Sequence, residues 1–136
     1  MVAPTRLQLR FNNFKKALLQ YQSAVNPHLS VLEKEGVIQR FEYTFELAWK
    51  CLQDLLVLRG YSEIRGPRPS IEKAFEDGLI QNGALWLEML QSRNETTHLY
   101  DEATFVRAST QVLGPYLVEL QRFSKIFFGD FEKWTR

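Results

Sequence analysis

A regular apolar stripe near the middle of the sequence limits the folds open to this chain. Apolar side chains recur there with gaps of three and four residues, at Ile38, Phe41, Phe45, Ala48, Leu52 and Leu55. Alternating gaps of this kind place side chains on one face of an α-helix. We therefore expect a central helix from about Glu33 or Val37 to Arg59, followed by Gly60 as a left-handed stop.

Similar spacing predicts helices on both sides of the central one. A stripe from Leu7 to Val25 indicates a first helix that ends before Pro27. A further helix begins near Gly83, with Asn82 as its cap, and leads into a polar run. A last stripe from Thr104 to Phe127 is interrupted at Gly114-Pro115, where we expect a kink or a brief break.

The segment after the central helix is rich in glycine and proline. Gly66, Pro67 and Pro69 predict an extended connection over residues 61–69, without room for a helix. Ser70 is expected to cap a short helix from Ile71 to Asp77. No segment shows the two-residue alternation of β-strands. We therefore expect residues 1–136 to form one all-α domain, an antiparallel four-helix up-down bundle with the short helix laid across a crossover.

Composition narrows the classes of function. The chain has one cysteine, which cannot form an internal disulfide. One cysteine and two histidines also cannot supply a structural zinc site of four cysteines, or one of two cysteines and two histidines. The net charge of +1 excludes a protein that coats nucleic acid and leaves only local contacts with RNA or DNA. No apolar run approaches the roughly 20 residues of a membrane span. We expect a cytoplasmic protein without a cofactor.

The aromatic content predicts self-association. The chain has 10 Phe, 5 Tyr and 3 Trp, which is generous for one small helical bundle. Some of these side chains are therefore expected on a flat face that pairs with a second copy. A homodimer follows from this interpretation.

The segment from Arg93 to Glu102 is polar, although the helix before it carries tryptophan and methionine. On a continuing helix Arg93, Thr97 and Tyr100 share one stripe, whereas His98 lies about 140° from Arg93 around the axis. Two arrangements bring arginine and histidine together. Either the helix distorts near Thr96 and Thr97, or two copies face each other and one subunit's arginine works with the other's histidine.

Arginine and histidine together suit phosphodiester chemistry. A guanidinium binds phosphate by paired hydrogen bonds, and a histidine can take or give a proton near neutral pH. With RNA, His98 would deprotonate the 2′-hydroxyl or protonate the leaving 5′-oxygen, while Arg93 stabilises the phosphoryl charge and Asn94 orients one partner. The structural alternative is that Arg93 pairs with Glu42 or Glu46 and His98 hydrogen-bonds to backbone at a helix end.

Charged residues elsewhere are candidates to support this cleft, together with Thr97. Glu42 and Glu46 lie one turn apart on the central helix, either on a solvated salt-bridged face or as buried partners of Arg93. Arg40 and Arg68 either extend an anion-binding surface or are ordinary surface arginines. His98, Asp101 and Glu102 have the spacing of a metal face, but one histidine with oxygen ligands binds weakly, so we expect no metal.

The polar segment also resembles a known signature. Arg93 to Tyr100 is similar to the R-N-x-x-x-H-x-Y pattern of the HEPN superfamily, and specifically of the group called nucleotidyltransferase substrate-binding proteins. Arg40 to Lys50 resembles the central-helix block of that group. Residues 67–70 with residues 75–80 resemble its connecting segment, so the resemblance spans nearly the whole chain.

The resemblance implies a four- to five-helix bundle, a homodimer, and a minimal nucleotidyltransferase, encoded by a neighbouring gene, that binds the chain. Such pairs often act as toxin and antitoxin. By resemblance Arg93 and His98, with Asn94 in support, serve a metal-independent endoribonuclease in the dimer cleft, and Tyr100 accepts AMP from the partner, which silences the nuclease. A noncatalytic subunit that presents a molecule, or itself, to the transferase is the alternative function.

Overall fold

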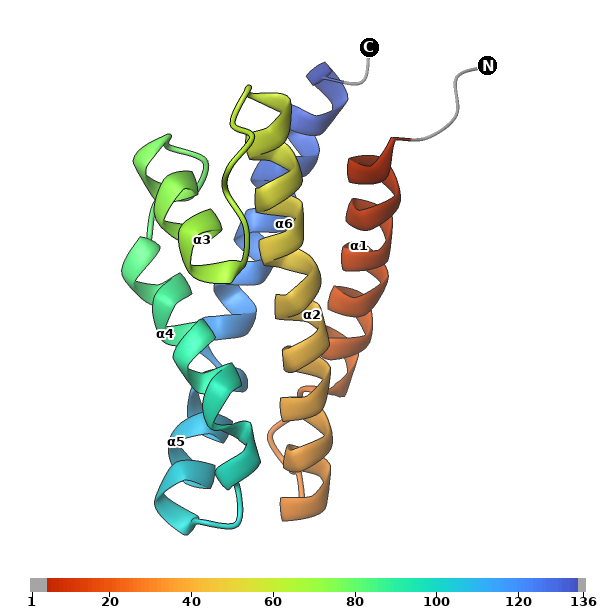
Figure 1. Cartoon of the computed structure of the whole chain (residues 1–136). Coiled ribbons are helices and arrows are strands. Elements are labelled where there is room, and N and C mark those ends of the chain that lie inside the picture. Colours follow the sequence, from red (N-terminus) through yellow and green to blue (C-terminus); the bar gives the residue numbers. More distant parts are fainter. Residues whose placement is uncertain (1–4, 135–136) are drawn as a thin grey trace.

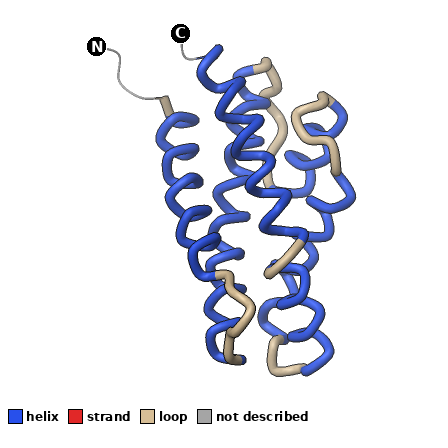
Figure 2. The backbone as a smooth tube through the Cα atoms, turned by 180° about the vertical axis from the view of Figure 1, so that it is seen from behind, coloured by secondary structure: helices blue, strands red, loops and turns tan. Residues whose placement is uncertain are grey.

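The computed structural model describes the backbone of residues 5–134 and the side chains of residues 5–127. The described part contains helices and loops only (Figure 2), which confirms the all-α fold class. The elements are α1 (Arg6–Ala24), α2 (Val31–Leu58), α3 (Pro67–Glu76), α4 (Gly83–Glu95), the 3₁₀ turn η1 (Thr96–His98), α5 (Glu102–Val112) and α6 (Pro115–Trp134). The antiparallel four-helix bundle stays a prediction, because the last apolar stripe is divided between α5 and α6.

Helix α2 is the central element, as the apolar stripe predicts. It is 28 residues long and contacts α1, α3, α5 and α6 (Figure 1). Its N-terminus is closed by a capping box, in which the Ser30 hydroxyl accepts from the Glu33 amide and the Glu33 carboxylate accepts from the Ser30 amide. After its C-terminus Gly60 has a φ of 100°, the left-handed conformation expected of it.

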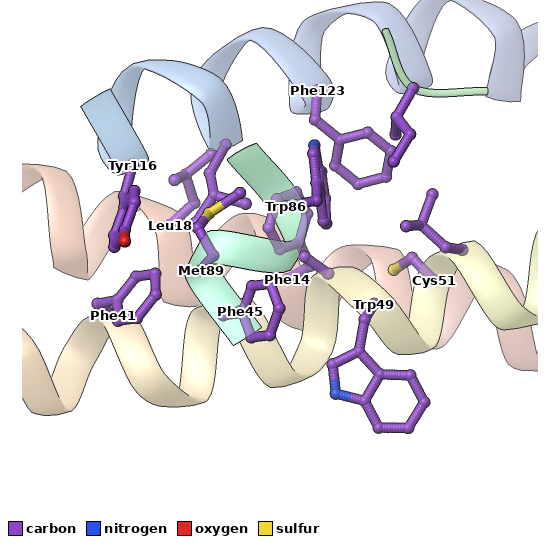
Figure 3. Packing of buried hydrophobic residues seen from close by; sticks show 14 of the residues in the cluster. Phe14, Leu18, Phe41, Phe45, Trp49, Cys51, Trp86, Met89, Tyr116 and Phe123 are labelled. Carbon is purple, nitrogen blue, oxygen red and sulfur yellow. The ribbon is translucent and has the colours of Figure 1, made fainter. Parts of the chain in front are cut away.

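Aromatic side chains from α1, α2, α4 and α6 form the centre of the core (Figure 3). Phe41 of α2 stacks on Tyr116 of α6 with ring centroids 5.2 Å apart. Trp86 of α4 meets Phe123 of α6 edge-on at 5.1 Å. The buried Trp86 indole also donates a hydrogen bond to the Glu119 carboxylate at 3.0 Å. These contacts fix α4, and with it the polar segment that follows, against α2 and α6.

The exposed aromatic side chains among residues 5–127 lie on three different segments. Tyr43, Phe75 and Tyr100 are exposed, and they lie on α2, on α3 and in the loop before α5. The residues after Phe127, which complete the aromatic tail, lie outside the described side chains. The homodimer therefore stays a prediction.

The expected connection over residues 61–69 is wrong at its end, because α3 begins at Pro67. Proline is compatible with the first turn of a helix, where backbone amides have no partner within the helix, and Pro67 and Pro69 both lie there. Ser70 is therefore not the cap. It lies inside α3, and its hydroxyl donates to the Gly66 carbonyl at 2.6 Å.

The break expected at Gly114-Pro115 is confirmed. Helix α5 ends at Val112 and α6 begins at Pro115, whose ring fits the first position of a helix. The Asn82 cap is also confirmed, since its side-chain oxygen accepts from the Leu85 amide at 3.2 Å. Together these two boundaries set the ends of the chain segment that carries the candidate site.

Candidate functional site

Helix α4 ends inside the polar segment and does not continue through it. The chain tightens into η1 at Thr96–His98, and the Asp101 amide then donates to the His98 carbonyl at 3.0 Å. The Thr96 hydroxyl donates to the Arg93 carbonyl at 2.8 Å, a local bond that competes with helix continuation. The helix is therefore distorted near Thr96, as one of the two predicted arrangements requires, but the distortion does not bring Arg93 and His98 into a described contact.

Arg93 points toward α2 and contacts its carboxylates. The guanidinium Nη1 lies 3.6 Å from Glu46 Oε1, and the two side chains are 29% and 33% exposed. The Arg93 Nε atom is buried and has no hydrogen-bond partner among the described residues. Part of the guanidinium is thus held between helices, and the Glu46 carboxylate already balances its charge. This pairing is the structural alternative predicted for Arg93.

Trp49 fixes the other side of the Glu46 carboxylate. Its indole Nε1 donates to Glu46 Oε2 at 2.8 Å, one helical turn along α2. Glu46 therefore bridges a tryptophan of its own helix and an arginine of α4. Because one oxygen serves each partner, the carboxylate is held in place toward Arg93.

Glu42, one turn before Glu46, completes the acidic side of the cluster. Burial raises the pKa of Glu42 above its ordinary value, whereas the nearby Thr96 hydroxyl and the positive charge of Arg93 act in the opposite direction. Two carboxylates of α2 therefore face one arginine of α4. An anionic ligand at Arg93 must compete with both.

His98 and Tyr100 form a second, more exposed pair. The Tyr100 hydroxyl lies 3.3 Å from His98 Nδ1, and the rings meet edge-on with centroids 5.9 Å apart. Tyr100 is 85% exposed, the largest exposure among the large hydrophobic side chains described. The pair therefore presents a phenol to solvent with an imidazole nitrogen beside its oxygen.

Ion pairs and caps hold this segment between α4 and α5. Glu95 accepts from Arg107 of α5 at 3.0 Å and from Gln91 at 2.9 Å, and these hydrogen bonds lower the pKa of Glu95. Asp101 caps α5 by accepting from the Thr104 amide at 3.0 Å, which lowers the pKa of Asp101. The loop that carries Tyr100 is thereby fixed at both ends.

The structure brings together only part of the predicted cleft. Arg93, Glu42 and Glu46 form one cluster and His98 with Tyr100 another, and no described contact joins Arg93 to His98. Asn94 and Thr97 are exposed and have no described side-chain partner.

The two arginines predicted to extend the cleft stand apart from both clusters. Arg40 is half-buried on α2, and Arg68 is exposed on the first turn of α3. Neither has an ion pair among the described residues. Their assignment to an anion-binding surface stays a prediction.

Three contributing residues escaped the sequence analysis. Trp49 has a signal in its spacing of three residues from Glu46, which places both on one helix face. Thr96 and Arg107 have no comparable signal, because their contacts with Glu42 and Glu95 depend on how α4, η1 and α5 meet.

Two classes of feature do not occur in the described part of the chain. No group of three or more His, Cys, Asp or Glu side chains is placed there to hold a metal ion. No helix of residues 5–134 combines the length and apolar character needed to cross a membrane.

Comparison with known proteins identifies the family of this chain. The chain is similar to the solved crystal structure of a protein from Thermus thermophilus, with a TM-score of 0.74 and 33% sequence identity over 81% of this chain and 94% of that one. No curated protein matches the sequence. The family model described as "Nucleotidyltransferase substrate binding protein like" matches residues 9–127, nearly the whole chain. This chain therefore belongs to the nucleotidyltransferase substrate binding protein like family.

Proposed function

We propose that this chain is the substrate-binding partner of a nucleotidyltransferase and that Tyr100 receives the nucleotidyl group. One observation carries the proposal, namely a phenol that is 85% exposed with its oxygen 3.3 Å from His98 Nδ1. An acceptor on a protein must enter the active site of another enzyme, which requires exposure. Proton removal from that acceptor requires a base within hydrogen-bond reach. Tyr100 and His98 meet both requirements.

The transfer step balances with groups at this site. The Tyr100 oxygen attacks the α-phosphorus of ATP, a bond forms between them, and the bond to the β-phosphoryl oxygen breaks. Pyrophosphate leaves, and the phenolic proton passes to His98 Nδ1, whose tautomer with an unprotonated Nδ1 accepts it. The metal and phosphate-binding groups for this reaction come from the transferase.

The Arg93 cluster supports the acceptor in this proposal. Its ion pair with Glu46 anchors the end of α4, from which η1 and the Tyr100 loop follow. Asn94 and Thr97 are exposed beside this anchor and would contact the transferase or its nucleotide. Arg40 and Arg68 are the remaining cations proposed for that surface. A nucleotidyl group on Tyr100 adds negative charge, which cations of that surface would attract.

We further propose that the chain has a HEPN-type fold and acts as a homodimer in the cytoplasm. The signature from Arg93 to Tyr100 supports the superfamily, and buried, unpaired Cys51 suits a reducing compartment. The partner is the nucleotidyltransferase encoded beside this chain.

A metal-independent endoribonuclease is the second candidate, with the chain as the toxin that the transferase silences. His98 is exposed and its Nε2 has no partner among the described residues, so this nitrogen is open to exchange a proton with RNA. Arg93 and His98 of one chain are not in contact, so this function requires the homodimer, in which the second copy supplies one of them. Modification of Tyr100 beside His98 would then block the site.

Transfer of label from ATP labelled at the α-phosphoryl group tests the acceptor function. We expect the cognate transferase to label the native chain and the Tyr43→Phe control, which removes another exposed phenol, and to leave Tyr100→Phe unlabelled. His98→Ala should slow labelling by about 10²-fold or more, as expected for loss of a general base. Equal labelling of native chain and Tyr100→Phe would contradict the proposal.

RNA cleavage in the presence of a chelator tests the second candidate separately. Cleavage by the native dimer that is lost in His98→Ala and Arg93→Met supports the nuclease. Equal and negligible cleavage by the native chain and both variants removes the nuclease and leaves the acceptor function untouched.

A further inference from the structure

A groove runs between α1 and α6, the two helices that lie side by side in the view from behind (Figure 2). It has a volume of about 710 Å³. Its apolar lining comes from Leu18 and Leu19 of α1 and Ile126 of α6. Leu19 is 61% and Ile126 46% exposed, so large apolar side chains remain open to solvent here. Exposed side chains of this kind are available to pack against an apolar partner surface.

The groove is also positively charged. Lys15, Arg122 and Lys125 line it, and no acidic side chain of residues 5–127 does. Helix α1 as a whole carries basic residues and no Asp or Glu. The acidic residue of α6 between Pro115 and Phe127 is Glu119, which is buried, accepts from Trp86 and forms an ion pair with Arg122 at 4.0 Å, so Lys15 and Lys125 supply the excess charge. With a net charge of +1 for the whole chain, this face holds a local excess of positive charge.

We propose that this groove binds an acidic amphipathic helix of a partner protein. Along α1 the lining runs from Lys15 to Gln22, a rise of about 10 Å or two helical turns. A helix of matching length presents apolar residues at positions i, i+3 or i+4, and i+7. Those residues pack on Leu19 and Ile126, and Asp or Glu side chains at the stripe's edges face Lys125 and Arg122.

Charge and shape exclude the other occupants. A second copy in a twofold contact would bring the same face of α1 against itself and oppose basic residues to basic residues. Single-stranded nucleic acid binds by stacking bases on aromatic rings, and none of the aromatic side chains that the structure describes lines the groove. A flat membrane surface does not enter a concave site. An acidic helix meets both the apolar lining and the cations.

This surface is distinct from the Tyr100 site. The groove lies on α1 and α6, whereas Arg93, His98 and Tyr100 lie on α4, η1 and the following loop. The inference is therefore independent of the proposed acceptor function, and each can fail alone.

Binding of a labelled synthetic helix to the full chain tests the proposal. The probe is a peptide of four helical turns with leucine at i, i+3, i+4 and i+7 and glutamate at its flanks, and the comparison peptide replaces every glutamate with lysine. Fluorescence anisotropy at low salt gives the affinity of each. We expect the acidic peptide to bind at least about tenfold more tightly than the basic one and to weaken as salt rises.

Matched variants locate the binding. Leu19→Glu should weaken the acidic peptide by about tenfold or more, and Leu58→Glu should not, although both leucines are 61% exposed. Lys125→Glu should weaken it by about fivefold, and Arg65→Glu on the loop before α3 should not. Circular dichroism and melting confirm that each variant is folded.

Three results would overturn the proposal. Equal affinity for the acidic and the basic peptide would mean that apolar contacts alone bind the peptide and that the cations of the groove do not contribute. Equal weakening by Leu19→Glu and Leu58→Glu would place the peptide elsewhere. Conversion of a native homodimer to a monomer by Leu19→Glu would show that a second copy fills the groove.

Discussion

Arg93 and Glu46 form an ion pair whose two halves should respond differently to substitution. Glu46→Gln removes a charge from a pair that is about one-third exposed, which costs about 0.2–1 kcal/mol. It also turns the charge-assisted hydrogen bond from Trp49 into a neutral one, a further loss of about 1 kcal/mol. The free energy of unfolding should therefore fall by about 1–2 kcal/mol. For 136 residues that lowers Tm by about 4–7 °C.

Arg93→Met removes the same ion pair together with a buried N–H that lacks a partner. The unpaired Nε costs about 1–3 kcal/mol in the native chain, and methionine keeps most of the side chain's apolar length. Loss of the ion pair and removal of the unpaired N–H act in opposite directions, so the free energy of unfolding should stay the same or rise by up to about 2 kcal/mol.

Urea unfolding of both single variants and the double variant measures this asymmetry. Arg65→Met, at an exposed arginine without an ion pair among the described residues, is the control and should change stability by less than about 0.5 kcal/mol. A coupling energy of about 0.2–1 kcal/mol that shrinks with added salt is expected for the pair. If Arg93→Met loses more stability than Glu46→Gln, the reasoning is refuted, because the guanidinium would then be a net stabilising group.

Three further predictions concern the core and the two shifted carboxyls. Phe41→Ala, at a fully buried ring, should lower the free energy of unfolding by about 3–5 kcal/mol, whereas Leu32→Ala, at a side chain that is 77% exposed, should change it little. Urea unfolding measures both variants, and similar losses of stability would contradict the assignment of Phe41 to the core. Burial raises the pKa of Glu42, so ionisation of this carboxyl disfavours the folded state. The stability of Glu42→Gln relative to the native chain should therefore increase as pH rises through that raised pKa. A pH-independent difference would argue against the shift. The lowered pKa of Asp101 means that its cap stabilises α5 above the pKa of the unfolded carboxyl and loses this effect as pH falls through the folded value. Asp101→Ala should therefore lower Tm at neutral pH and have no effect at a pH below both values, and a loss at acid pH equal to that at neutral pH would contradict this.

Local signals were sufficient to predict most helix boundaries. The apolar stripes, the Asn82 cap and the Gly60 stop are set by a few neighbouring residues, so the sequence alone predicts them. The start of α3 differs from the expected one, because Pro67 and Pro69 lie in the first turn of a helix, where a proline costs no hydrogen bond. The family resemblance did not correct that boundary.

The candidate site was predicted in part. Pairing of Arg93 with Glu46 was one of two predicted alternatives, since a half-buried arginine requires an acidic partner. The contact between His98 and Tyr100 was not predicted, because residues two apart point to nearly opposite sides of a continuing α-helix. It exists because the chain leaves the α-helix at Glu95, tightens through η1 and turns before α5. That path depends on tertiary contacts such as the Glu95–Arg107 ion pair.

Identification of the modified residue by peptide mass spectrometry is the most direct test of the acceptor function. The full chain is incubated with the cognate nucleotidyltransferase, ATP and magnesium, digested and fragmented. We predict one nucleotidyl group per chain, on the peptide that contains Tyr100 and on the phenolic oxygen itself. A chain left unmodified by an active transferase, or a nucleotidyl group carried by any residue other than Tyr100, would contradict the proposal.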